Sequence, residues 1–267
     1  MQTVLMESPT MPELSDDQSL MSRFVGAVPT VAKQSSRDLH GALLKAVGVA
    51  DFELTVTGRR EISPHYLRLG FHGGGLLSGR SIHPTMWVRM WFPDESRLHM
   101  RAFTLVEPDA GGDRFDIEFA LHEGRASNWA RNARVGDTIM ATIRGSRFAI
   151  PQPPPAGYLV VGDTASLPAI NSLLAAIGDA PATVWLEWQH EDDRDLPVAA
   201  TARTEVTWVP REHGGAALVH QVRAAAFAAP GHFGWVACDR WTTRKVASVL
   251  RNDFHLARNS LAARGYW

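Results

Sequence analysis

The sequence has little of what metal-based redox proteins rely on. Cys238 is the only cysteine, which excludes an internal disulfide and a cysteine-ligated iron–sulfur cluster. The eleven histidines show no HxH or HExxH spacing, so no metal site is predicted from them. Any redox chemistry in this chain would therefore need an organic cofactor.

Lysine is also scarce, and the charges nearly cancel. The chain has 3 lysines and 24 arginines, and its formal net charge is −1. With no basic tail and no excess of positive charge, the sequence does not indicate a nucleic-acid-binding protein. Any anion-binding site is expected to be built from guanidinium groups, which bind anionic oxygens through two parallel hydrogen bonds.

Long apolar runs are missing as well. No stretch approaches the roughly twenty apolar residues of a membrane span, so we expect no stable membrane insertion. Residues 1–14 lack the basic start and long apolar core of a signal peptide. These features predict a soluble, cytoplasmic protein, while its oligomeric state cannot be predicted.

A length of 267 residues with 45% hydrophobic residues is typical of two folded domains. Asp16–Val28 and Ser36–Val49 carry helical apolar spacing, which predicts a helical N-terminal extension of unknown role over residues 1–49. For residues 50–150 the pattern predicts a small closed antiparallel β-barrel with one short helix. Its six predicted strands are Phe52–Thr57, Tyr66–Phe71, Trp87–Phe92, Leu98–Leu105, Phe115–Leu121 and Thr138–Ile143.

Beyond the stiff run Pro151–Pro155, residues 151–267 alternate continuous apolar strands with helices. That alternation predicts a parallel α/β sheet covered on both faces. The predicted strands are Tyr158–Val161, Thr183–Trp188, Glu205–Val209 and Phe233–Cys238, and the helices are Leu167–Ile177, Ala216–Ala228 and Trp241–Leu256.

Two short strings in the barrel region suggest a cofactor site. Arg101-Ala102-Phe103-Thr104 offers a guanidinium, an aromatic ring and a hydroxyl, although strand alternation turns Thr104 away unless the strand bends. The string from Gly124 to Ala130 has the composition of a helix start, with Gly124 and Ser127 placed for a turn and a cap. Free N–H groups at a helix start bind phosphates, so the two strings together predict a flavin dinucleotide site. The first string alone would equally suit a strand-edge arginine with two core neighbours.

In the second domain, Gly162-Asp163-Thr164-Ala165-Ser166-Leu167-Pro168 follows an apolar strand. Open α/β sheets bind nucleotides at such strand ends, although GxGxxG is missing here. An ordinary strand-to-helix turn with an early proline is the alternative interpretation.

The order of these motifs resembles the siderophore-interacting protein family, within the ferredoxin–NADP reductase-like flavoproteins. The motifs are R-x-aromatic-T, LH…G-x-A-S-x-W-A, VGD…LPAI, Trp208 to Arg211, and Gly265-Tyr266-Trp267. The resemblance covers residues 50 to 267 and leaves residues 1–49 unexplained.

The resemblance implies FAD as cofactor, NAD(P)H as electron donor and a ferric siderophore as substrate. Thr104 near the flavin N5 and His122 beside the ring would be the catalytic residues. The FAD contacts would come from Arg101, Ala102, Phe103, Thr104, His122, Gly124, Ala126 and Ser127. The nicotinamide contacts would come from Asp163 and Ser166, with Trp267 near the isoalloxazine.

The sequence departs from the family pattern at several of these positions. Phe103 stands where tyrosine is usual, and Arg125 replaces a proline. Thr164-Ala165-Ser166 and Cys238-Asp239-Arg240 also differ from the usual residues, so nicotinamide binding is less firmly predicted than FAD binding.

The resulting prediction is a cytoplasmic NAD(P)H-dependent ferric-siderophore reductase that releases Fe²⁺. Arg89, Arg144 and Arg147 are candidates for drawing in an anionic ferric complex, although solvated surface charge explains them equally well. Two alternatives remain open at this point. One is a flavin enzyme with another acceptor, such as a quinone or a protein, and the other is a flavoprotein that binds the ferric siderophore without turnover.

Overall fold

We describe a computed structural model of residues 52–93, 99–143 and 146–267. The predicted N-terminal extension, residues 1–49, and Arg144 lie outside these residues. All described residues belong to one compact unit. It contains an antiparallel β-sheet followed in the chain by a parallel one.

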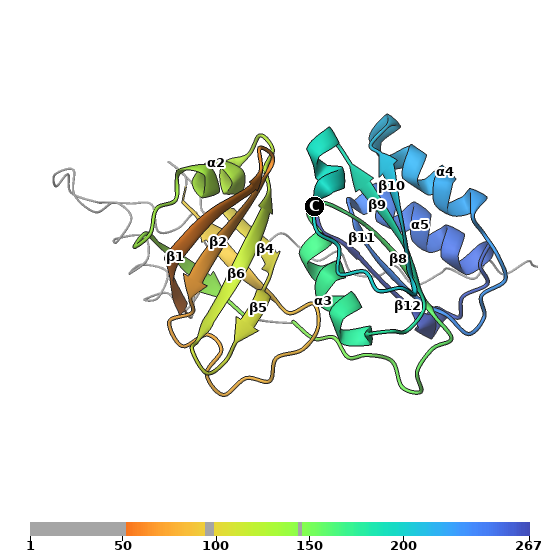
Figure 1. The fold of residues 1–267 in the computed structure, drawn as a ribbon, viewed down its shortest axis with the longest axis horizontal. Helices are drawn as coiled ribbons and strands as arrows, with labels where there is room; N and C mark the ends of the chain where they lie inside the picture. The colour runs from red at the N-terminus through yellow and green to blue at the C-terminus, as the bar shows by residue number, and fades with distance from the viewer. Residues whose placement is uncertain (1–51, 94–98, 144–145) are drawn as a thin grey trace, which may run out of the picture. The chain divides into compact units, whose positions relative to one another are not determined.

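The antiparallel sheet has seven strands in the order β4-β3-β7-β1-β2-β6-β5, and it curls around one apolar core (Figure 1). No ladder joins its outer strands, β4 and β5, within the described residues, so the sheet is a half-barrel where the sequence predicts a closed barrel. Its strands are β1 (Phe52–Ser63), β2 (Tyr66–His72), β3 (Trp87–Phe92), β4 (His99–Thr104), β5 (Val106–Asp109), β6 (Arg114–Ala120) and β7 (Thr138–Thr142).

The predicted strand Leu98–Leu105 is followed by a separate strand, β5, that the sequence pattern does not reveal. Leu105 lies between β4 and β5, and Glu107 has a positive φ of 48°. The β5–β6 pairing shifts register between Val106 and Asp109. A short strand that contains such an irregularity lacks the regular alternation by which strands are predicted.

Helix α2 (Arg125–Asn132) packs against the half-barrel through Ala130, which is fully buried, and Trp129. The Trp129 ring lies 5.7 Å from that of Phe92 and 6.4 Å from that of Phe71. This packing fixes the first turn of α2 relative to the strands.

The parallel sheet has the order β10-β9-β8-β11-β12. Successive residues of β8 face opposite sides: Tyr158 and Val160 pack on the α3 side, Leu159 and Val161 on the α4 and α5 side. Figure 1 shows α3 on one face and α4 with α5 on the other. The elements are β8 (Tyr158–Asp163), α3 (Leu167–Ile177), β9 (Ala182–Trp188), β10 (Thr204–Pro210), α4 (Ala216–Ala224), β11 (Phe233–Cys238), α5 (Arg240–Asn252) and β12 (Leu261–Gly265).

This order creates a topological switch point beside β8. The chain proceeds from β8 to β9 and β10 on one side and then crosses to β11 on the other. Open α/β sheets bind ligands at this point, outside the carboxyl ends of the strands. Asp163 ends β8 and Asp239 follows β11, so both carboxylates lie at this edge.

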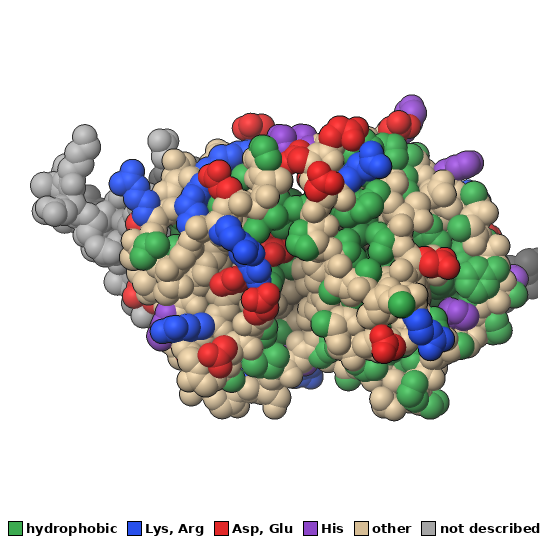
Figure 2. Space-filling model, in the orientation of Figure 1, with side chains coloured by type: hydrophobic (Ala, Val, Ile, Leu, Met, Phe, Trp, Pro, Cys, Tyr) green, Lys and Arg blue, Asp and Glu red, His purple; other side chains and the backbone are tan. Residues whose placement is uncertain are grey.

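On the face shown in Figure 2, acidic and basic side chains are interspersed, in keeping with the small net charge. Within the described ranges, each helix is too short or too polar to cross a membrane.

Candidate active site

A cavity of about 740 Å³ is lined by both the half-barrel and the parallel sheet. Its size suits an organic cofactor with part of a second ligand. The half-barrel side includes the predicted residues Arg101, Ala102, Phe103, His122, Gly124, Ala126 and Ser127. The parallel-sheet side includes Asp163, Thr164, Ala165, Gln189, His190, Asp193, Tyr266 and Trp267.

Arg101 and Phe103 reach this cavity from the same strand, β4. The Arg101 side chain is exposed, and its Nη1 donates to the neighbouring Met100 carbonyl at 2.9 Å. No carboxylate of the described residues forms an ion pair with Arg101, which leaves its guanidinium available to a ligand anion. The Phe103 ring is half-buried against Phe119, 4.6 Å between ring centres, so one part of it remains open to a planar ligand.

Thr104 is buried and does not line the cavity, as strand alternation predicts. Its hydroxyl lies beside the phenol of Tyr266. Burial raises the pKa of Tyr266 to about 12, while the nearby Thr104 hydroxyl acts to lower it. The structure therefore places Thr104 behind the cavity wall rather than on its surface.

The first turn of α2 opens onto the cavity with uncapped N–H groups. Gly124 is the N-cap residue, with φ 155°, and no side chain caps this helix end. The expectation that Ser127 caps the helix is wrong: Ser127 lies inside the first turn, and its Oγ accepts from the His122 N–H at 3.2 Å. A Cβ on Gly124 would lie 3.0 Å from the His122 ring. Free N–H groups here, with no side chain at position 124, suit an anionic oxygen.

Asp163 anchors the opposite side of the cavity. It is 3% exposed; its Oδ1 accepts from the Ser166 N–H, and its Oδ2 accepts from the Trp267 indole N–H, each at 2.9 Å. Burial raises the pKa of Asp163, and the hydrogen bonds from Trp267 and Ser166 oppose that rise. Ser166 is fully buried, its Oγ bonded to the Asp163 backbone, and it does not line the cavity.

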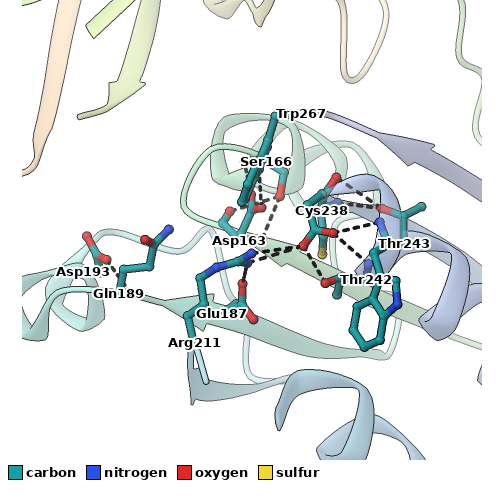
Figure 3. A network of polar contacts seen from close by, with 12 residues as sticks. Asp163, Ser166, Glu187, Gln189, Asp193, Arg211, Cys238, Thr242, Thr243 and Trp267 are labelled. Atoms are coloured by element: carbon teal, nitrogen blue, oxygen red, sulfur yellow. Dashed lines mark hydrogen bonds and ion pairs between the residues drawn. The ribbon is translucent and has the colours of Figure 1, made fainter. Parts of the chain in front are cut away.

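A network of charged residues that the sequence motifs did not reveal lies beneath Trp267 (Figure 3). Arg211, which follows β10, pairs with Glu187 of β9 and lies 3.4 Å from Asp239. The Arg211 guanidinium carbon is 4.8 Å from the centre of the Trp267 ring. Asp239 also caps α5, accepting from the N–H groups of Trp241 and Thr242. Since carboxyl ends of parallel strands meet at one sheet edge, residues just at or beyond predicted strand ends were the available signal.

Glu187 should make the stability of the protein depend on pH. Burial raises its pKa from the ordinary 4.5 to about 7, although Arg211 opposes the rise. Between these values the folded state binds more protons than the unfolded state, so stability falls as pH rises from about 4.5 to about 7. The slope from one such group is at most about 1.4 kcal/mol per pH unit. Urea unfolding at several pH values should show this slope in the parent and not in Glu187→Gln.

Of the proposed substrate arginines, Arg89 and Arg147 lie in the described part of the chain, and neither lines the cavity. Arg147 is exposed, and the Arg89 guanidinium lies over the Trp87 ring, 4.7 Å from its centre. Arg264 of β12 lies over the same ring at 5.4 Å. These arginines therefore belong to a surface outside the cavity, and their part in substrate binding stays a prediction.

The curled antiparallel sheet followed by a parallel sheet is a ferredoxin–NADP reductase-like fold. A ferredoxin NADP+ reductase from Neisseria gonorrhoeae, solved with FAD and NADP bound, superposes with a TM-score of 0.60 at 12% identity, over 82% of this chain and 100% of that one. The siderophore-interacting protein SipS from Aeromonas hydrophila superposes with a TM-score of 0.68 at 22% identity, over 80% of this chain and 90% of that one.

Two family models match the sequence: the siderophore-interacting FAD-binding domain over residues 81–145 and the siderophore-interacting protein over residues 155–267. The chain belongs to this siderophore-interacting protein family. The match confirms the resemblance inferred from the motifs, and it supports FAD as the cofactor.

Two named relatives differ in how much of their length the chain covers. The mycobactin import ATP-binding/permease protein IrtA of Mycolicibacterium smegmatis is 34% identical over 239 residues, 87% of this chain and 27% of that protein. The ferric vibriobactin reductase ViuB of Vibrio cholerae is 25% identical over 174 residues, 62% of this chain and 64% of that protein. The chain thus spans about a quarter of the IrtA length.

Proposed function

We propose that this protein is a ferric-siderophore reductase that uses FAD and a reduced nicotinamide nucleotide to release iron as Fe²⁺. The observation that carries the proposal is the cavity itself. It brings Arg101, Phe103 and the uncapped start of α2 together with Asp163 at the sheet's switch point. In this proposal a flavin on the half-barrel side would lie beside a nucleotide at the switch point, as hydride transfer between the two requires.

The half-barrel residues fit FAD by their chemistry. The Arg101 guanidinium and the first N–H groups of α2 would hold the diphosphate, with Gly124, Ala126 and Ser127 around it. Phe103 would stack on the isoalloxazine, with His122 at the cavity edge. FAD supplies a carrier that accepts a hydride and can release electrons one at a time.

The acceptor is proposed from the names of relatives and from iron chemistry. One relative is named for mycobactin import and another for ferric vibriobactin reduction. Hard oxygen donors hold Fe³⁺ more tightly than Fe²⁺, so one-electron reduction loosens the complex. We place the reaction in the cytoplasm, where reduced nicotinamide nucleotides are available. Arg89, Arg144 and Arg147 remain proposed contacts that attract an anionic complex.

The direct test is iron release by the FAD-loaded protein. Under anaerobic conditions, NADH or NADPH is mixed with a ferric siderophore and a ferrous chelator that forms a coloured complex. Colour should develop only when protein, nucleotide and ferric siderophore are all present. Fast flavin reduction without iron release, but with quinone turnover, would instead indicate another acceptor. If the ferric complex binds but no nucleotide reduces the flavin, the protein is a binder without turnover.

Trp267 is expected to limit access of the nucleotide to the flavin. Its side chain is 52% exposed and lines the cavity, while Tyr266 packs against Trp235 at 6.3 Å. Trp267→Ala should keep FAD bound and change the rate of flavin bleaching by NAD(P)H more than twofold. The substitution removes the indole ring from the sheet edge where the nucleotide is proposed to bind. Stopped-flow traces at equal FAD occupancy measure this, with Trp241→Ala, an exposed tryptophan outside the cavity lining, as control. Equal rates in Trp267→Ala and the parent would remove the gating role.

A further inference from the structure

A largely buried carboxyl group, that of Glu118, lines the half-barrel side of the cavity. Glu118 lies on β6 beside Phe119, and only 10% of its side chain is exposed. Its Oε2 lies 3.1 Å from the Tyr66 hydroxyl, and its Oε1 lies 3.7 Å from Arg68 Nε. A carboxyl group in this position can exchange a proton with a bound ligand.

The charges around Glu118 favour its neutral form. Arg68 faces three carboxylates: Asp116 at 2.8 Å, Glu107 at 3.0 Å and Glu118 at 3.7 Å. One cation cannot balance three anions, and Glu118 is both the least exposed of the three and the most distant from the guanidinium. Burial raises the pKa of Glu118, and the pull of Arg68 only partly offsets it. Burial raises the pKa of Asp116 as well, but its closer ion pair opposes that rise.

Charged side chains on the neighbouring elements also affect the protonation of Glu118 and Tyr66. Arg60 on β1 is exposed and favours the charged form of Glu118. From the parallel-sheet side, Asp163 and Asp193 face Tyr66 and raise its pKa further, after burial and Glu118 itself. These two carboxylates oppose a negative charge on the Tyr66 phenol, which therefore keeps its hydrogen.

The hydrogen bonds of the Tyr66 hydroxyl also favour a protonated Glu118. Its hydroxyl is fully buried and lies within hydrogen-bonding distance of two oxygens, Glu118 Oε2 at 3.1 Å and the Thr164 carbonyl at 3.2 Å. A phenol has one hydrogen and cannot fully satisfy two acceptors. A protonated Glu118 resolves this, because its O–H donates to the phenol oxygen while the phenol donates to Thr164.

We propose that Glu118 holds a proton in the resting protein and supplies it when the flavin is reduced, a role that rests on the proposed function. In the FAD-loaded protein, the O–H bond of Glu118 would break as the nicotinamide donor gives up a hydride with its electron pair, and the proton would pass to the bound flavin. Hydride and proton together account for the two hydrogens that the isoalloxazine gains. When the acceptor later removes the electrons, Glu118 takes its proton back, and the second proton goes to solvent.

The test is a reduced-minus-oxidised infrared difference spectrum of the FAD-loaded protein. The flavin is reduced by light with an added sacrificial amine as electron donor, so that no nucleotide is needed. The parent should show a protonated-carboxyl C=O band that shifts in D₂O and disappears on reduction. Glu118→Gln should lack the band, whereas Asp116→Asn, a control in the same cluster, should keep it. With NADH or NADPH, Glu118→Gln should also bleach at least tenfold more slowly and lose its dependence on pH.

Two outcomes would overturn the proposal: a band that survives in Glu118→Gln, or a band that reduction leaves unchanged. If Glu118→Gln does not hold FAD, Glu118→Asp serves instead and should show the band at a shifted frequency. Should the band respond to light while neither nucleotide reduces the flavin, the reductase function fails and the Glu118 assignment stands.

Discussion

Replacing Arg101 with alanine should weaken FAD binding roughly 10- to 100-fold, because a charge-assisted hydrogen bond to phosphate contributes about 1.5 to 3 kcal/mol. Arg101 is exposed and its guanidinium bonds only its neighbour's carbonyl among the described residues, so the fold should lose little. Titration of the apoprotein with FAD, followed by flavin fluorescence, measures the loss.

Arg134→Ala is the matched control, since Arg134 is exposed in the same half-barrel and lies outside the cavity lining. It should bind FAD like the parent, with both variants unfolding at the parent's midpoint. If Arg101→Ala binds FAD as tightly as the parent, the assignment of Arg101 to the phosphates is wrong. Phe103→Tyr should keep or tighten binding, because stacking is retained and a phenol hydroxyl is added.

Replacing Arg211 with alanine should destabilise the protein by about 3 to 5 kcal/mol at pH 8, because it leaves buried carboxylates without their cation. Glu187 is 2% exposed and loses its ion pair, and Asp239 loses one partner. At pH 5 the loss should be smaller, since Glu187, with its pKa raised to about 7, already carries a proton there and does not need a cation. Urea unfolding at both pH values gives the two free energies.

Arg203→Ala, an exposed arginine just before β10, serves as the control and should change stability little. The double variant Arg211→Ala with Glu187→Gln should recover part of the loss at pH 8. A loss at pH 8 no larger than that of Arg203→Ala would contradict the view that Arg211 balances buried charge. The Trp267 ring, which Arg211 contacts, should also become more mobile.

Strand and helix positions were largely predictable because their apolar periods are regular. The prediction for β3 and β11 matches the structure at both ends, and that for helix Leu167–Ile177 does as well. Helix α4 ends at Ala224 rather than Ala228, since the residues 225–228 contain no glycine or proline that would signal the end of a helix. Strand β12 was missed because Leu261–Gly265 has few β-branched residues and gains its place by pairing with β11.

The candidate site was predictable only where its residues are close in sequence. Arg101 with Phe103, and Gly124 with Ser127, are local motifs, and the structure brings both to one cavity. Arg211, Glu187 and Asp239 come from three separate strand ends, so their pairing follows only from the order of the strands. Glu118 was hidden within an alternating strand pattern that indicated a polar face and no role.

The most direct test of the whole account is the visible spectrum of the purified protein, recorded anaerobically before and after NADH or NADPH is added. We expect an oxidised flavin spectrum, FAD as the cofactor released by acid, and bleaching by at least one nucleotide. Subsequent addition of a ferric siderophore should restore the colour. A colourless protein that takes up no FAD, or a flavin that neither nucleotide bleaches, would contradict it.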